Sequence, residues 1–117
     1  MIRITPDGSL VTRPCSYVAV FSALGQKPRA GEPEYWRRLR EDGYATLETA
    51  NKFIRENLPV KRRKDYKRGE RPLLRNLHLA GKAVVCVYGH YLYLDGETYH
   101  SFFDNDDDEV VSVWELG

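Results

Sequence analysis

The sequence has few cysteines, no long apolar run and no secretory signal, and each absence excludes a class of protein. It contains two cysteines, Cys15 and Cys86, which indicates free thiols in a reducing cytoplasm rather than a disulfide framework. One Cys15–Cys86 disulfide is the alternative. The longest apolar runs are far too short to cross a membrane, and the first residues lack the apolar core of a signal peptide. We therefore expect a cytoplasmic protein with no membrane partner.

Patterns for metals and cofactors are also missing. Cys86, His90, His100 and Asp104 do not have the spacing of a zinc site. The acidic run at 104–109 lacks the spacing and central glycine of a calcium loop, which predicts a solvated turn. The sequence has no glycine-rich phosphate loop either. We expect no metal and no cofactor.

The composition is that of one globular domain spanning residues 1–117. Hydrophobic residues make up 42% and charged residues 30% of the 117 residues, which is enough for a single core. The net charge of +1 implies no particular partner, but the charge is unevenly placed. Eight Lys and Arg lie between positions 61 and 75, against two acids, and five acids lie between 104 and 109.

The first half of the chain predicts helices. Residues 16–24 are apolar on every side, between Pro14 and Gly25, so they predict a buried helix with Cys15 in its first turn. Helical spacing also predicts helices over 33–42 and 46–57. A further short helix is expected within 72–79. The segment 60–71 has no apolar period and is expected to be a basic loop.

The second half predicts strands. Beyond Gly81 the period changes to that of strands over 83–88, 90–94, 98–103 and 109–116. Asp95-Gly96 is a turn dipeptide between two of them. A short edge strand is expected within residues 1–5. The predicted fold is α+β, with N-terminal helices packed on a C-terminal antiparallel β-meander.

Three residues predict a nucleophilic site. Helix N-termini and a neighbouring imidazolium lower the pKa of a thiol, so Cys15 is a candidate nucleophile. His90 opens one strand of the hairpin and Asp104 follows the other, so a hairpin can bring an imidazole beside a carboxylate. The alternatives are a Cys15 that only packs the helix, a His90 bonded to a backbone carbonyl, and His100 in the role of His90. Asn105 is a second candidate to orient the imidazole.

The register of the hairpin decides between two arrangements. A two-residue loop centred on Asp95-Gly96 places His90 on one face with Ser101 and Phe103. A three-residue loop places it with His100, Phe102 and Asp104 instead. Only the second register, or a bulge near Phe103, brings Asp104 to the imidazole.

The order of these motifs resembles that of papain-like cysteine peptidases. A cysteine at a helix start precedes a Gly89-His90 strand and a carboxylate on the next strand. Residues 82–115 are similar to a group of small bacteriophage-encoded papain-like proteins, with an Asp-Gly turn, an aromatic-Asp pair and a terminal strand that ends in an aromatic. The resemblance is looser over 13–25. It implies a minimal papain-like fold with Cys15 as nucleophile, His90 as base and Asp104 as orienting residue, and the cytoplasm of a host cell as its location.

The sequence departs from that family at the oxyanion donor. Papain-like enzymes usually carry a glutamine a few residues before the cysteine, whereas residues 9–14 contain neither Gln nor Asn. Thr12, Ser9 and the Cys15 backbone N–H are the remaining candidate donors. A missing donor typically lowers the rate by about 10²–10³-fold.

Two functions follow from these patterns. The first is a cysteine hydrolase that cleaves an amide or isopeptide bond in a protein or peptide substrate. The second is a weakly active or inactive papain-like phage protein that binds a host protein or a nucleic acid through its basic segment. An aromatic among cations can follow a phosphate backbone, although such runs are usually solvated. The residues of that candidate surface are Lys61, Arg62, Arg63, Lys64, Lys67 and Arg68.

Overall fold

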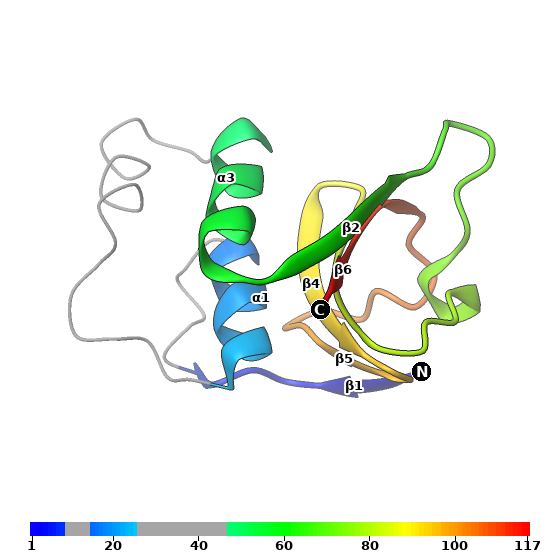
Figure 1. The fold of residues 1–117 in the computed structure, drawn as a ribbon. Coiled ribbons are helices and arrows are strands. Elements are labelled where there is room, and N and C mark those ends of the chain that lie inside the picture. Colours follow the sequence, from blue (N-terminus) through cyan, green and yellow to red (C-terminus); the bar gives the residue numbers. More distant parts are fainter. Residues whose placement is uncertain (9–14, 26–46) are drawn as a thin grey trace.

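The computed structural model describes residues 1–8, 15–25 and 47–117, and it confirms the α+β class (Figure 1). Within these residues one six-stranded mixed sheet packs against two α-helices. The predicted helix at 33–42 and the candidate donors Ser9 and Thr12 lie outside the described residues. The elements are β1 (Ile2–Ile4), α1 (Cys15–Leu24), α3 (Leu47–Asn57), β2 (Val60–Asp65), a 3-10 helix (Leu74–Asn76), β3 (Lys82–Val87), β4 (His90–Asp95), β5 (Thr98–His100) and β6 (Val110–Leu116).

The sheet is not the antiparallel meander that the sequence predicts. Its strand order is β1-β5-β4-β3-β6-β2, and β1 pairs with β5 in parallel. Only β3, β4 and β5 form a meander, because β6 returns to pair with β3 and does not lie beside β5. The strand expected over 98–103 ends at His100, where Ser101 N–H bonds to the Ile4 carbonyl. The outer edge of β5 is therefore occupied by the N-terminal strand.

The prediction of a loop over 60–71 was wrong for its first half, which forms edge strand β2. This strand pairs antiparallel with β6, with an irregularity between Val60 and Arg62. Its long side chains lie along the sheet: the Arg63 guanidinium is 4.8 Å from the centre of the Trp114 ring, and Lys64 is 4.8 Å from the Tyr66 ring. The stems of charged side chains can cover apolar surface, so an edge strand needs no apolar alternation.

The short helix expected within 72–79 is a single 3-10 turn, Leu74–Asn76. Leu74 and Leu77 are buried. They pack with Val85, Leu92 and other residues of the sheet face opposite the helices. One turn is sufficient because Leu74 and Leu77 are three residues apart, which is the repeat of a 3-10 helix.

The two helices cover the other face of the sheet. Residues Tyr17 to Phe21 of α1 are all buried, which agrees with a helix that is apolar on every side. In α3 the buried side chains include Phe53 and Ile54, and the Tyr17 and Phe53 rings stack at 5.8 Å. The sheet residues beneath the helices alternate with those of the opposite face, as the period of two requires. They are Val84, Cys86, Tyr91 and Trp114.

Candidate active site

Cys15 is the first residue of α1 and is half-buried beside β4. The start of an α-helix leaves its first backbone N–H groups without helical acceptors, and its dipole favours negative charge. The sequence predicted Cys15 in the first turn of this helix, and the structure places it there. Both Cys15 and Cys86 are free thiols.

His90 is the first residue of β4 and is also half-buried. Strands β4 and β5 pair as Tyr93–His100, Leu94–Tyr99 and Asp95–Thr98, so the two-residue loop is Gly96-Glu97, one residue later than Asp95-Gly96. Because β5 stops at His100, the first residues of β4 have no partner on this side. The His90 imidazole therefore lies at an open edge of the sheet.

This register gives His90 the neighbours of the two-residue alternative. The His90 Nε2 atom lies 3.0 Å from the Ser101 hydroxyl oxygen, and the Phe103 ring meets the imidazole edge-on at 5.7 Å. Residues alternate between the two faces of a sheet, so the register that places Ser101 and Phe103 on the face of His90 assigns Asp104 to the opposite face. The sequence analysis did not give Ser101 a role, although the register itself indicated that it shares the face of His90.

A chain of hydrogen bonds continues from Ser101 into the acidic run. The Ser101 hydroxyl donates to Asn105 Oδ1 at 2.6 Å and accepts from the Phe103 backbone N–H at 3.2 Å. The Asn105 side-chain NH₂ donates to Asp108 Oδ2 at 2.7 Å. Ser101 and Asn105 are buried and Asp108 is half-buried. Asp108 was not a candidate at all, since one acid in a run of five carries no sequence signal of its own.

Asp104 makes other contacts. One of its carboxylate oxygens accepts from the Tyr99 hydroxyl at 3.3 Å and from the Asp106 backbone N–H at 3.1 Å. The same Tyr99 hydroxyl accepts from the Asn105 backbone N–H. In this structure the side chain beside His90 Nε2 is Ser101, and Asn105 follows it in the chain of hydrogen bonds. Asp104 instead bonds to Tyr99 and to the backbone of Asp106.

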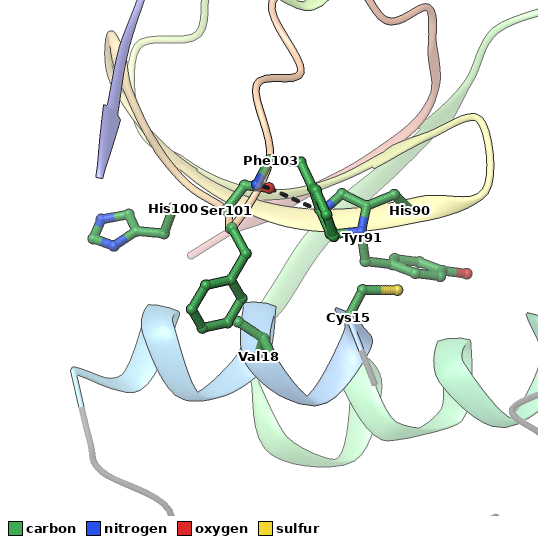
Figure 2. Close-up of a pocket in the computed structure, with 8 residues that line it drawn as sticks. Cys15, Val18, His90, Tyr91, His100, Ser101 and Phe103 are labelled. Atoms are coloured by element: carbon green, nitrogen blue, oxygen red, sulfur yellow. Dashed lines mark hydrogen bonds between the residues drawn. The ribbon is translucent and has the colours of Figure 1, made fainter. Parts of the chain in front are cut away.

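Cys15 and His90 line the same cavity, which has a volume of about 230 Å³. Figure 2 shows Cys15 and Val18 on α1 directed toward β4, with Tyr91 above the sulfur and His90 bonded to Ser101. Phe102, Phe103 and His100 complete the wall. Among the described residues no hydrogen bond joins the Cys15 thiol to His90.

Burial sets the electrostatics of this region. It lowers the pKa of His90, while the nearby Asp108 carboxylate acts in the opposite direction. Burial raises the pKa of Cys86 to about 11, and Cys15 adds to that rise. Burial also raises the pKa of Tyr91, whose hydroxyl donates to Asn51 Oδ1 at 3.1 Å. A neutral imidazole and a protonated Cys86 follow at neutral pH.

The candidate basic surface lies on β2 and the residues after it. Two of its cations have acidic partners: Arg62 bonds to Glu115 at 2.5 Å and Arg63 to Asp65 at 2.9 Å. Lys61, Lys67 and Arg68 are exposed and form no salt bridge within the described part of the chain, although the charge of Lys61 acts on Glu115. The exposed positive charge is therefore smaller than the sequence indicates.

The described residues hold no group of three or more His, Cys, Asp or Glu side chains that could bind a metal ion. In the same residues, no helix has the length and apolarity needed to span a bilayer. No protein family, curated protein or solved structure matches this chain. The function is therefore argued from the geometry of the site alone.

Proposed function

We propose that this protein is a cysteine hydrolase that cleaves an amide or isopeptide bond, with Cys15 as nucleophile and His90 as general base. The observation that supports it best is that a helix-start cysteine and a strand-start histidine, 75 positions apart in the sequence, line one cavity. Such a pair is the minimum needed for nucleophilic catalysis by a thiol. Their arrangement is also the one that a papain-like fold would give.

The position of Cys15 suits a nucleophile. At the N-terminus of α1 the helix dipole favours negative charge, which suits a thiolate formed when the Cys15 proton passes to His90. The second thiol provides a contrast within the molecule, because burial keeps the pKa of Cys86 at about 11. Cys86 is therefore a buried, protonated thiol, whereas Cys15 is half-buried and lines the cavity.

The surroundings of His90 suit a base with a fixed orientation. Its Nε2 atom is occupied by Ser101, and Ser101 is in turn held by Asn105. This favours Asn105, acting through Ser101, over Asp104 as the orienting residue. The Nδ1 atom then remains to exchange a proton with the Cys15 thiol.

The reaction is that of a thiol hydrolase. The Cys15 thiol passes its proton to His90, and the thiolate attacks the carbonyl carbon of the substrate. The C–N bond breaks and the amine leaves with the proton from His90. Water then gives a proton to His90 and hydrolyses the thioester, which releases the acid and restores the thiol. The backbone N–H at the start of α1 is the available donor to the oxyanion.

The cavity indicates the size of the group that it accepts. Its volume of about 230 Å³ is below the range of about 300–1,000 Å³ typical of small-molecule sites. Val18, Phe102 and Phe103 give it apolar walls. One apolar side chain of a protein or peptide substrate fits this description.

The test is the rate at which iodoacetamide alkylates Cys15 near neutral pH, with the labelled peptide identified by mass spectrometry. Cys15 should react faster than an ordinary thiol, and His90→Gln should slow that reaction because the imidazole that accepts the thiol proton is lost. The matched control is His78→Gln, the same substitution at an exposed histidine. An ordinary rate that His90→Gln leaves unchanged would refute the hydrolase.

Binding of a nucleic acid through β2 and the residues after it is the second candidate function, and the exposed cations of this segment favour it. Contacts between cations and phosphates make the affinity for a nucleic acid depend on salt, so the measurement is the salt dependence of binding. Affinity for a duplex or single strand should fall steeply between about 50 and 200 mM salt if Lys61, Lys67 and Arg68 contact phosphates.

The triple substitution of these three residues with Gln should abolish that affinity. A control triple substitution removes three exposed cations elsewhere, at Arg3, Lys52 and Arg55. Equal losses in the two triple variants, or no binding at low salt, would leave β2 without a nucleic-acid role.

A further inference from the structure

Hydrogen-bond donors and acceptors in the His90 chain can be assigned without ambiguity, starting from its charged end. A carboxylate only accepts, so the Asp108 Oδ2 atom, 2.7 Å from the Asn105 amide, must face its NH₂ group. The Asn105 Oδ1 atom therefore faces Ser101, 2.6 Å away. Since an amide oxygen only accepts, the single hydroxyl proton of Ser101 is donated to Asn105.

This assignment fixes the protonation of the imidazole. The Ser101 oxygen has given its only proton to Asn105 and accepts from the Phe103 backbone N–H. Toward His90 Nε2, 3.0 Å away, it can only accept. The Nε2 atom must therefore carry a proton, which leaves Nδ1 as the atom with a free lone pair when the ring is neutral.

We propose that Asp108 is a positioning residue that determines, through Asn105 and Ser101, which nitrogen of His90 acts as the base. The inference deepens the proposed hydrolase, on which its catalytic meaning rests. Asp108 touches no substrate. It sets the direction of the Asn105 amide, and the amide sets the direction of the Ser101 hydroxyl.

The geometry of the loop supports this role. The Asp108 backbone N–H bonds to the Asn105 carbonyl at 3.0 Å, so a tight turn holds the carboxylate against the amide. The Asp108 carbonyl accepts from the Leu74 N–H at 2.9 Å, and Leu74 is fully buried. The carboxylate at the end of the chain is thus attached to the core and not to a free surface turn.

The neighbouring acid provides a control. Asp107 belongs to the same turn and is exposed, and its carboxylate pairs with Arg75. Removing either carboxylate changes the net charge equally, but only Asp108 contacts Asn105. A difference between the two variants therefore reports what Asp108 does locally, through its hydrogen bond to Asn105 and its charge near His90, and not the net charge of the protein.

The experiment measures the tautomer of His90 by ¹⁵N NMR of the imidazole at about pH 7.5, where a histidine of lowered pKa is neutral. The signal is assigned by its loss in His90→Gln. The wild-type protein should have the proton on Nε2. Asp108→Ala should move the tautomer ratio by about tenfold toward Nδ1–H, the equivalent of one hydrogen bond, whereas Asp107→Ala should not move it.

Two further variants test the chain of hydrogen bonds. Asp108→Asn keeps the shape but adds an NH₂ donor, so it no longer holds the Asn105 amide in one direction and should shift the tautomer in the same direction as Asp108→Ala. Ser101→Ala removes the link, so adding Asp108→Ala to it should have no further effect on the tautomer. A wild-type imidazole protonated on Nδ1 overturns the proposal even if every variant fails to fold. So does an Asp108→Ala protein that matches Asp107→Ala.

The outcome is distinguishable from that of the hydrolase itself. An Nε2–H tautomer that responds to Asp108→Ala, together with an ordinary Cys15 alkylation rate, would keep the positioning chain and refute the hydrolase. A fast alkylation rate at Cys15, together with an imidazole protonated on Nδ1, would refute the positioning chain and keep the reactive thiol.

Discussion

The Phe53→Ala substitution tests the packing that positions Cys15. Phe53 lies on α3 with 1% of its side chain exposed, and its ring stacks on Tyr17 of α1 at 5.8 Å. Tyr17 in turn stacks on Phe21 at 4.4 Å, so the helix that begins at Cys15 is held by an aromatic cluster. Removing the Phe53 ring leaves a cavity against one side of α1.

The expected loss is large compared with the stability of a small domain. Truncation of a fully buried Phe costs about 3–5 kcal/mol, a range that already includes the loss of ring contacts such as the stack on Tyr17. A loss of about 4 kcal/mol is a substantial part of the roughly 5–15 kcal/mol that stabilises a typical domain. It corresponds to a decrease in Tm of roughly 15 °C.

Urea unfolding followed by circular dichroism measures this loss as a change in midpoint at constant slope. The control is Lys52→Ala, at the preceding position of the same helix, where the side chain is exposed and pairs with Glu56. Its effect should stay within about 0.5 kcal/mol. A Phe53→Ala loss below about 1 kcal/mol would refute the packing of α3 on α1, and with it the placement of the Cys15 helix.

Three further substitutions test individual contacts. Because burial lowers the pKa of His90 in the folded protein, the unfolded state binds more protons as the pH falls below about 6.5, and the free energy of unfolding decreases. His90→Gln should flatten that decrease in urea titrations and His78→Gln should not; equal slopes would contradict it. Tyr91→Phe removes the hydroxyl that joins β4 to Asn51 of α3 and should lower the free energy of unfolding by about 1 kcal/mol. An unchanged free energy of unfolding would mean that the hydroxyl bonds to water and not to Asn51. Gly96 has a φ of 62° in the hairpin loop, so Gly96→Ala should lower the melting temperature through backbone strain, and an unchanged value would argue for a different turn.

The elements that the sequence predicted well have a local signal. The helix at Cys15 is recognisable because its residues are apolar on every side between two breakers, and the structure begins it at that residue. The strands β3, β4 and β6 have apolar runs bounded by turns, and their limits differ from the prediction by at most one residue. The Asp95-Gly96 signal located the hairpin, although the loop begins one residue later.

The elements that the sequence missed depend on distant partners. Strand β2 was predicted as a loop because its residues are charged, and what makes it a strand is pairing with β6. The parallel pairing of Ile2–Ile4 with β5 is likewise invisible to a local pattern. At the site, the sequence identified His90 and Asn105 but not Asp108, because the conformation of the turn, and not its composition, selects one acid out of five.

The acidic run is therefore more than the solvated turn that the sequence indicates. Its backbone accepts from Leu74 and Arg75, which fixes it to the buried 3-10 turn on the sheet face opposite the helices. Its side chains reach Tyr99 through Asp104 and Asn105 through Asp108. The cavity thus lies between two supports: the helix layer positions the thiol, and the opposite layer, through this run, positions the imidazole. Because Cys15 is carried by α1 and His90 is bonded to Ser101 and Asn105, a substitution in one support can alter the orientation of its own residue and leave the other in place. The reactivity of the thiol and the tautomer of the imidazole can therefore be measured as separate properties.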